Sequence, residues 1–195
     1  MANIRLVIFD LDETIVKNTI PFSEIREKVL SAVGSRENPA HLYEFIRDNY
    51  PDYLPILEHE EINRAKSAYV DPVFEEILKF LRDNGINVAV LTRNSRKAAL
   101  IALGDYAGRI DALITRDDGF PPKPAPDAIF YLMGRFSSTP SSTIMVGDYD
   151  YDIEAGKLAG CITVRIGKGD GDYVISSLKE VIKIISDIIE TSESL

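Results

Sequence analysis

The sequence contains a single cysteine, Cys161, among its 195 residues. No intrachain disulfide can form, so a reducing cytoplasm is the expected setting. The apolar neighbours of Cys161 predict a buried and inert thiol. No apolar run approaches the roughly 18 residues needed to span a bilayer, and residues 1–5 lead into a strand without a signal-peptide pattern. We therefore expect a cytoplasmic protein that does not act at a membrane.

Basic residues are also in the minority. There are 22 lysines and arginines against 31 aspartates and glutamates, which gives a formal net charge of -9. That balance argues against a nucleic-acid or anionic-membrane surface, because such a surface requires a basic face. An acidic protein can still hold a phosphate, but only through a local group of cations or a metal ion.

Apolar runs alternate with helical patterns along most of the chain, without internal repeats or low-complexity segments. This alternation predicts an α/β fold, a Rossmann-like parallel sheet of about five strands with helices on both faces. Residues 174–189 have an apolar stripe and predict the last helix. The expected strands are residues 4–9, 86–91, 110–115, 144–146 and 161–166.

Residues 18–70 differ from the rest, because they show helical patterns and no convincing strand. We interpret them as a small helical unit inserted after the first strand. The catalytic core would then comprise residues 1–17 and 71–195. A length of 195 residues suits one core domain with a modest insertion.

The first strand ends in two carboxylates, Asp10 and Asp12, separated only by Leu11. Open α/β sheets hold their ligands at the carboxyl ends of such strands. A simpler interpretation treats both aspartates as loop residues, one of which caps a helix. The pair alone does not decide between these interpretations.

Further polar residues follow other strand ends and turns. Thr92 follows the second strand, and Asp148 follows the fourth, with Asp152 four positions later. Lys123 lies among four prolines that restrict its backbone. Three of them have an ordinary alternative: a helix cap for Thr92, a solvated surface group for Lys123, and a favourable helix dipole for Asp152. Asp148 is harder to explain in this way, because it ends the strand itself.

Considered together, these residues suit a divalent metal and a phosphate. Mg²⁺ prefers oxygen ligands and keeps several waters, so Asp10, Asp12 and Asp148 with one phosphate oxygen would suffice. Thr92 and Lys123 would supply donors to the other phosphate oxygens. The metal would also offset the clustered carboxylates.

This ordered set resembles the motifs of the haloacid dehalogenase-like (HAD) superfamily, whose members are mostly Mg²⁺-dependent phosphatases. Asp10-Leu11-Asp12-Glu13-Thr14-Ile15 is similar to the first motif, usually Asp-x-Asp-Gly-Thr-Leu. Thr92 matches the second motif and Lys123 the third. Gly147-Asp148 with Asp152 matches the fourth. The residues around Thr92 and Lys123 resemble phosphoglycolate phosphatase-like members.

The resemblance implies a role for each matched residue. Asp10 would be the nucleophile that forms an aspartyl-phosphate, and Asp12 would protonate the leaving oxygen and then activate water. Thr92 would orient the phosphoryl group, and Lys123 would neutralise charge on it. Mg²⁺ would be held by Asp10, the Asp12 carbonyl and Asp148, with Asp152 supporting the site or binding the metal through water. The substrate phosphate would contact Leu11, Asp12, Thr92, Arg93 and Lys123.

The family places a small helical cap after its first motif, where residues 18–70 lie. Glu13 departs from the usual glycine and adds negative charge near the site. The acid at Asp12 disfavours dehalogenases and phosphonate-cleaving members, which lack it. The cationic residues of the cap are candidates to bind a substrate carboxylate or a second phosphate, but we favour solvated surface groups for all of them. They are Arg26, Arg36, Arg47, Arg64 and Lys66. We likewise interpret His41 and His59 as surface residues and not as catalytic ones.

Three functions are compatible with these motifs. The first is hydrolysis of a small phosphomonoester, such as phosphoglycolate or a sugar phosphate. The second is a phosphomutase of the same fold, and the third is non-catalytic binding of a phosphometabolite. For each we expect a small phosphorylated partner, no nucleic acid, and a monomer or homodimer.

Overall fold

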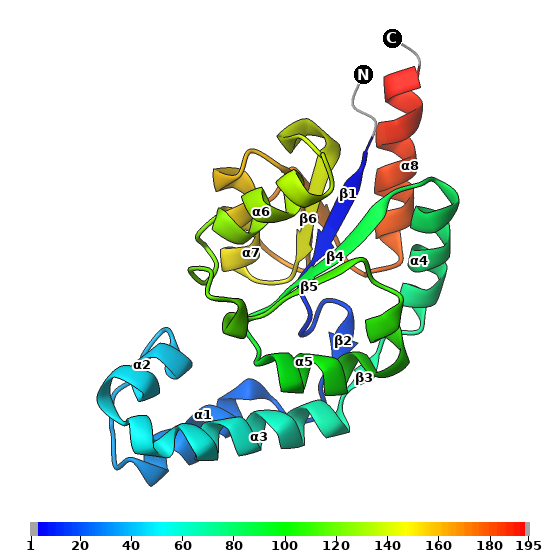
Figure 1. Ribbon diagram of the computed structural model, residues 1–195. Helices are drawn as coiled ribbons and strands as arrows, with labels where there is room; N and C mark the ends of the chain where they lie inside the picture. Colours follow the sequence, from blue (N-terminus) through cyan, green and yellow to red (C-terminus); the bar gives the residue numbers. More distant parts are fainter. Residues whose placement is uncertain (1–3, 194–195) are drawn as a thin grey trace.

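A parallel sheet forms the centre of the computed structural model, which describes residues 4–193 (Figure 1). All neighbouring strands in this sheet pair in parallel. In spatial order the strands are β5 (Ala112–Ile114), β4 (Asn87–Leu91), β1 (Leu6–Phe9), β6 (Thr143–Gly147), β7 (Ile162–Ile166) and β8 (Tyr173–Ile175).

Strand β1 lies between β4 and β6 at the centre of the sheet. Phe9 is in register with Val90 on one side and Val146 on the other. The four residues of β1 are all buried, which confirms the expected strand covered on both faces. The Asp10 backbone N–H donates to the Val146 carbonyl at 2.9 Å, so the sheet fixes the start of the following loop.

Helices cover both faces of the sheet (Figure 1). Helices α4, α5 and α8 contribute to one buried cluster, and α6 and α7 contribute to the cluster on the opposite face. Their bounds are α4 (Val73–Asp83), α5 (Arg96–Leu103), α6 (Asp127–Arg135), α7 (Asp150–Leu158) and α8 (Glu180–Glu193). Short 3₁₀ turns occur at Pro51–Tyr53, Gly104–Gly108, Arg116–Asp118 and Pro140–Ser142.

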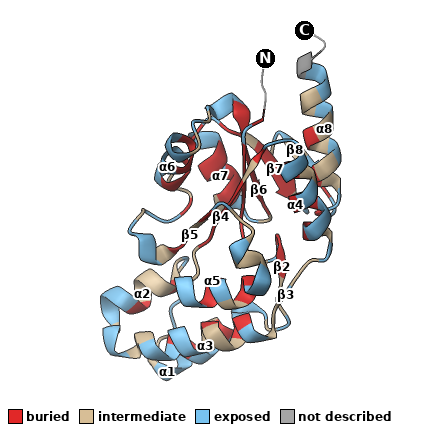
Figure 2. Cartoon of the chain, turned by 45° about the vertical axis from the view of Figure 1, so that its right-hand side comes forward, coloured by how far each residue is buried: buried red, intermediate tan, exposed pale blue. Residues whose placement is uncertain are grey.

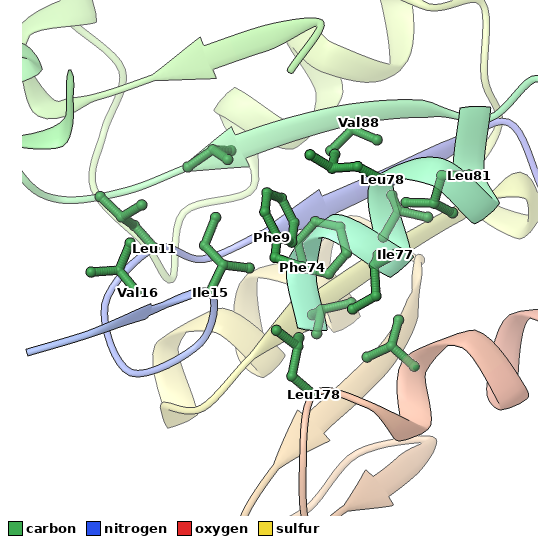
Figure 3. Close-up of a cluster of buried hydrophobic side chains, with 14 of the residues drawn as sticks. Phe9, Leu11, Ile15, Val16, Phe74, Ile77, Leu78, Leu81, Val88 and Leu178 are labelled. Atoms are coloured by element: carbon green, nitrogen blue, oxygen red, sulfur yellow. The ribbon is translucent and has the colours of Figure 1, made fainter. Parts of the chain in front are cut away.

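The core beneath β1 is built around two phenylalanines (Figure 3). Phe9 and Phe74 of α4 meet edge to face, with ring centroids 5.5 Å apart and an interplanar angle of 84°. Both side chains are fully buried. Packing of this kind stabilises the sheet and therefore holds the end of β1 in one position.

The insertion after β1 forms a separate cluster of helices beyond the carboxyl ends of the strands (Figure 1). It comprises α1 (Phe22–Ala32), α2 (Leu42–Asn49) and α3 (Leu54–Ser67). Ile25, Val29, Leu42, Ile46 and Leu57 form its own buried core. Most of its outer residues are exposed (Figure 2).

Two short strands join the insertion to the core. β2 (Val16–Lys17) and β3 (Tyr69–Val70) pair in an antiparallel ribbon. The sequence pattern did not indicate them, because two residues are too few to show alternation. They lie at both expected boundaries of residues 18–70, and the division into two domains stays a prediction.

The sheet has one strand more than the sequence predicted. Residues Tyr173–Ile175 form β8, and the last helix begins only at Glu180, not at residue 174. Glu180 Oε1 accepts hydrogen bonds from the backbone N–H groups of Ser176 and Ser177, which orders the turn before the helix. In the part of the chain that the structure describes, no helix is long and apolar enough to cross a membrane.

Candidate active site

Lys123 joins two carboxylates that are far apart in the sequence. Its Nζ lies 2.5 Å from Asp10 Oδ1 and 2.5 Å from Asp152 Oδ1, and it also donates to the Leu91 carbonyl at 3.0 Å. The Lys123 side chain is only 4% exposed. The alternative of a solvated lysine is therefore excluded, and all three donor directions of this ammonium group are used.

Burial and neighbouring charge change the acidity of these groups. Burial, followed by the Asp152 carboxylate, raises the pKa of Asp10 well above its usual value, although Lys123 lowers it. Burial alone would lower the pKa of Lys123, but its contacts with Asp10 and Asp152 raise it. Burial, and then Asp152, also raise the pKa of Asp148. The positive charge of Lys123 thus does not fully offset the negative charge of the carboxylates around it.

Asp10, Asp148 and Asp152 can hold a metal ion together. Each offers a carboxylate oxygen, and these oxygens all lie within 4.8 Å of one another. Thr14 Oγ1 donates to Asp148 Oδ1 at 3.2 Å, which orients that carboxylate. An all-oxygen, acidic donor set suits a hard divalent cation, and its charge would offset the surplus of carboxylates.

The Asp12 side chain is hydrogen-bonded to both the insertion and the core. Oδ1 accepts hydrogen bonds from Arg64 Nη1 at 2.7 Å and from Asn18 Nδ2 at 2.8 Å, while Oδ2 accepts one from Asn94 Nδ2 at 2.7 Å. Both oxygens therefore have donors, and one of those donors, Arg64, comes from α3. The metal ligand expected from Asp12 is its backbone carbonyl, so its side chain is free to make these hydrogen bonds.

The residues after β4 have distinct contacts. Thr92 is buried, and its Oγ1 accepts from the Asn94 backbone N–H at 3.1 Å. Ser95, not Thr92, caps α5 by accepting from Ala98 N–H at 3.2 Å. The helix-cap alternative for Thr92 is therefore wrong.

Asp10, Asp12, Thr92, Lys123, Asp148 and Asp152 line one cavity of about 490 Å³ between the insertion and the core. Arg93 lines it too, and its guanidinium pairs with Glu44 of α2 at 3.1 Å. The Leu11 side chain is buried in the main core, so only its backbone remains for a phosphate contact. The structure thus brings together every side chain expected to act in catalysis.

One interpretation of the insertion's charged residues was wrong. Arg64 is only 7% exposed, and its Nε also donates to the Ile20 carbonyl at 2.9 Å. Arg36, Arg47 and Lys66 are exposed as expected. The helical pattern of α3 gave no signal for the burial of Arg64, because its partner, Asp12, lies 52 positions away.

His41 also differs from a simple surface residue. Its ring lies 5.3 Å from that of Tyr151, and its Nδ1 is buried without a hydrogen-bond partner among the described residues. His59 is exposed, as expected. Cys161 is buried, as expected, and burial raises the pKa of its thiol to about 12, as in a structural cysteine.

A buried ion pair that the sequence did not indicate joins the insertion to the core. Arg116 Nη1 and Nη2 donate to Glu61 Oε1 and Oε2 at 2.6 and 2.7 Å. Both side chains are 8% exposed, and both residues line the cavity. Arg116 also lies 4.0 Å from the centre of the Tyr43 ring. One feature of the sequence could have indicated Arg116 as a site residue: it lies just after strand β5.

Residues 4–160 match the family model of haloacid dehalogenase-like hydrolases. The chain belongs to this family. The family match covers every sequence segment that contributes to the candidate site, from Asp10 to Asp152. The protein is thus a hydrolase with a HAD-like fold, as the ordered motifs indicated.

Named relatives are similar along nearly their whole length. A phosphoglycolate phosphatase from Aquifex aeolicus is 23% identical, covering 95% of this chain and 98% of the relative. The pyrophosphatase PpaX from Halalkalibacterium halodurans is 26% identical, and the match covers 93% of this chain and 97% of the relative. A crystal structure of a predicted phosphoglycolate phosphatase from Haemophilus somnus has a TM-score of 0.77 at 19% identity, covering 94% of this chain and 99% of that one. This last likeness shows the fold.

Proposed function

We propose that the protein is a Mg²⁺-dependent phosphatase that hydrolyses a small phosphomonoester through an aspartyl-phosphate intermediate. The observation that carries this proposal is the buried contact of Lys123 with Asp10 and Asp152, beside the third carboxylate of Asp148. The names of the relatives support phosphate chemistry and include both an ester and an anhydride substrate.

In the first half of the reaction, Asp10 Oδ attacks phosphorus, and the bond from phosphorus to the substrate oxygen breaks. Asp12 gives its proton to that leaving oxygen. Lys123 offsets charge on Asp10 and on the phosphoryl oxygens, and Thr92 orients the group by donating from Oγ1. Arg93 and the Leu11 backbone complete the expected phosphate contacts. Positioning and charge stabilisation are the main contributions of an enzyme to this chemistry.

In the second half, Asp12 takes a proton from water, whose oxygen attacks the phosphorus of the aspartyl-phosphate; the bond from phosphorus to Asp10 Oδ breaks, which releases inorganic phosphate and regenerates the carboxylate. Asp10, the Asp12 carbonyl, Asp148 and Asp152 would hold Mg²⁺. When bound, the metal supplies positive charge that orients the phosphate and offsets its charge. Closure of the insertion over the site would exclude water from the first half.

Turnover of p-nitrophenyl phosphate with and without Mg²⁺ tests the proposal, with Asp10→Asn as the critical variant. We expect Mg²⁺-dependent release of nitrophenol in the wild type and none above background in the variant. Unchanged turnover by Asp10→Asn would exclude it as the nucleophile. Beryllofluoride with Mg²⁺, which mimics a phosphorylated aspartate, should bind the wild type and not the variant.

Product analysis separates hydrolysis from phosphoryl transfer to a second hydroxyl. With a sugar phosphate as substrate, a phosphatase yields inorganic phosphate in equal amount to the sugar. A phosphomutase would yield an isomeric sugar phosphate and little free phosphate, and that result would overturn the proposal.

A further inference from the structure

The arginines that face the cavity already have partners. Three of these arginines form ion pairs between the insertion and the core, each with a carboxylate that also lines the cavity. These pairs are Arg64–Asp12 at 2.7 Å, Arg93–Glu44 at 3.1 Å and Arg116–Glu61 at 2.6 Å. A guanidinium that is paired with a carboxylate offers little net charge to a second anion.

The other two arginines of the cavity wall are also engaged. Arg47 donates through Nε and Nη2 to the adjacent Asp48 at 2.6 and 3.0 Å. Arg26 Nη1 donates to the Pro39 carbonyl and to Asn38 Oδ1. Arg26 thus has neutral partners and is the only cavity-lining arginine of the described residues for which no carboxylate contact is seen.

Aromatic side chains from both parts of the molecule supply much of the remaining wall. The cavity of about 490 Å³ has a size typical of sites for ligands much larger than a two-carbon acid phosphate. Aromatic rings favour apolar or planar groups, because they bury a large area with little loss of conformational freedom. The aromatic lining residues are Phe22, Tyr43, Phe120, Tyr149 and Tyr151.

We propose that the physiological substrate has an uncharged leaving group with an apolar or ring-shaped body, and that the paired arginines select against a carboxylate on that group. This inference rests on the proposed phosphatase function and narrows its substrate class. Phosphoglycolate, which carries a carboxylate on a two-carbon leaving group, is then a poor substrate. The phosphoryl group lies at Asp10 and the metal site with its leaving oxygen towards Asp12, while the body of the leaving group occupies the aromatic part of the cavity.

Three primary alkyl phosphates test this proposal under the same conditions with Mg²⁺: 2-phenylethyl phosphate, ethyl phosphate and phosphoglycolate. We expect kcat/KM for the phenylethyl ester to exceed that for the ethyl ester by at least about tenfold, as filling an apolar pocket requires. Phosphoglycolate should be the poorest of the three. If it were the best, the inference would be wrong while the phosphatase function stood. Absence of turnover with all three and with p-nitrophenyl phosphate would overturn the function itself.

A second experiment makes an arginine available to a substrate carboxylate. Glu61→Gln removes the charge that neutralises Arg116, so kcat/KM for phosphoglycolate relative to phenylethyl phosphate should rise about tenfold, as one charge-assisted hydrogen bond allows. The buried position of Glu61 can affect folding, so Glu44→Gln, which releases Arg93 at a partly exposed site, provides an independent variant. An unchanged ratio in both folded variants would contradict the proposal.

Two control variants separate this effect from general changes in charge. Glu75→Gln releases Arg109 from an exposed ion pair whose two residues do not line the cavity, and it should leave the ratio unchanged. Arg26→Gln should also leave it unchanged. A selective loss of phosphoglycolate hydrolysis in Arg26→Gln would identify a carboxylate site and overturn the inference.

Discussion

Arg64 Nη1 donates a hydrogen bond to Asp12 Oδ1 over 2.7 Å, and this contact links helix α3 of the insertion to the second carboxylate of the Asp-Leu-Asp motif. Asn94 holds the other carboxylate oxygen from the core side. The orientation of Asp12 therefore depends on both parts of the molecule. In the proposed mechanism Arg64 positions Asp12, because its guanidinium donates to that carboxylate.

Replacement of Arg64 by glutamine should impair proton donation by Asp12. General acid catalysis contributes about a hundredfold or more, and a good leaving group needs it least. We expect Arg64→Gln to lower kcat/KM for an alkyl phosphate by about a hundredfold and for p-nitrophenyl phosphate by less than about tenfold. Arg47→Gln is the matched control, since Arg47 lines the same cavity but pairs with Asp48. Equal losses with both substrates would contradict a positioning role.

Replacement of Lys123 by methionine should destabilise the metal-free protein. The substitution leaves Asp10 and Asp152 buried without their shared cation, which costs about 3–5 kcal/mol in comparable buried pairs. Urea unfolding with and without Mg²⁺ measures the effect. Mg²⁺ should recover part of the loss, because it also offsets these carboxylates. Unchanged stability without metal would show that the contact with Lys123 contributes little.

Stability in the absence of metal should depend on pH in a defined direction. Asp10 and Asp148 have raised pKa values, so the folded chain binds their protons more tightly than the unfolded chain. The free energy of unfolding should therefore fall as pH rises from the ordinary carboxyl range through the folded pKa values. Urea unfolding between about pH 4 and pH 8 checks this sign. Asp10→Asn should remove much of the dependence, and Mg²⁺ should stabilise most at the alkaline end.

Gly147 should be intolerant of a side chain for a reason specific to the site. A Cβ there would lie 2.3 Å from Asp152 Cβ and 2.4 Å from Asp152 Oδ2, so Asp152 would have to move. Gly147→Ala should weaken Mg²⁺ binding and lower kcat by at least about tenfold, a typical effect of a small displacement of catalytic groups. Isothermal titration calorimetry and turnover measure both effects.

Gly134→Ala serves as the control for that substitution. Gly134 lies in α6, and an added Cβ meets nothing within 4 Å. Alanine should stabilise this helix by up to about 1 kcal/mol without changing turnover. Normal Mg²⁺ binding by Gly147→Ala would show that Asp152 adapts without loss.

The sequence was informative wherever a local pattern and the tertiary structure agree. The apolar run before Asp10 predicted a strand that is buried on both faces of the sheet, and β1 is such a strand. Strand β8 was not predicted, because Tyr173–Ile175 continues into residues whose apolar spacing also fits a helix. The break at Ser176 and Ser177 depends on hydrogen bonds to Glu180, which composition does not indicate.

The candidate site likewise contains some contacts that the sequence predicts and others that it does not. Asp10, Thr92 and Asp148 follow strands whose carboxyl ends lie side by side, so their convergence follows from parallel topology. The partners Arg64–Asp12 and Arg116–Glu61 are 52 and 55 positions apart. Their pairing depends on how the insertion packs on the core, and no periodicity within either segment encodes that contact.

The β2–β3 ribbon has a consequence for how such proteins diversify. The chain leaves the core at Lys17 and returns at Tyr69, and these two residues are directly paired. Antiparallel partners have Cα atoms only about 5 Å apart, a gap that a short hairpin turn closes. Everything between them can therefore be shortened, lengthened or exchanged without moving β1 or α4. A different insertion would leave the carboxylate cluster of the core in place, but it would have to supply its own partner for Asp12 in place of Arg64.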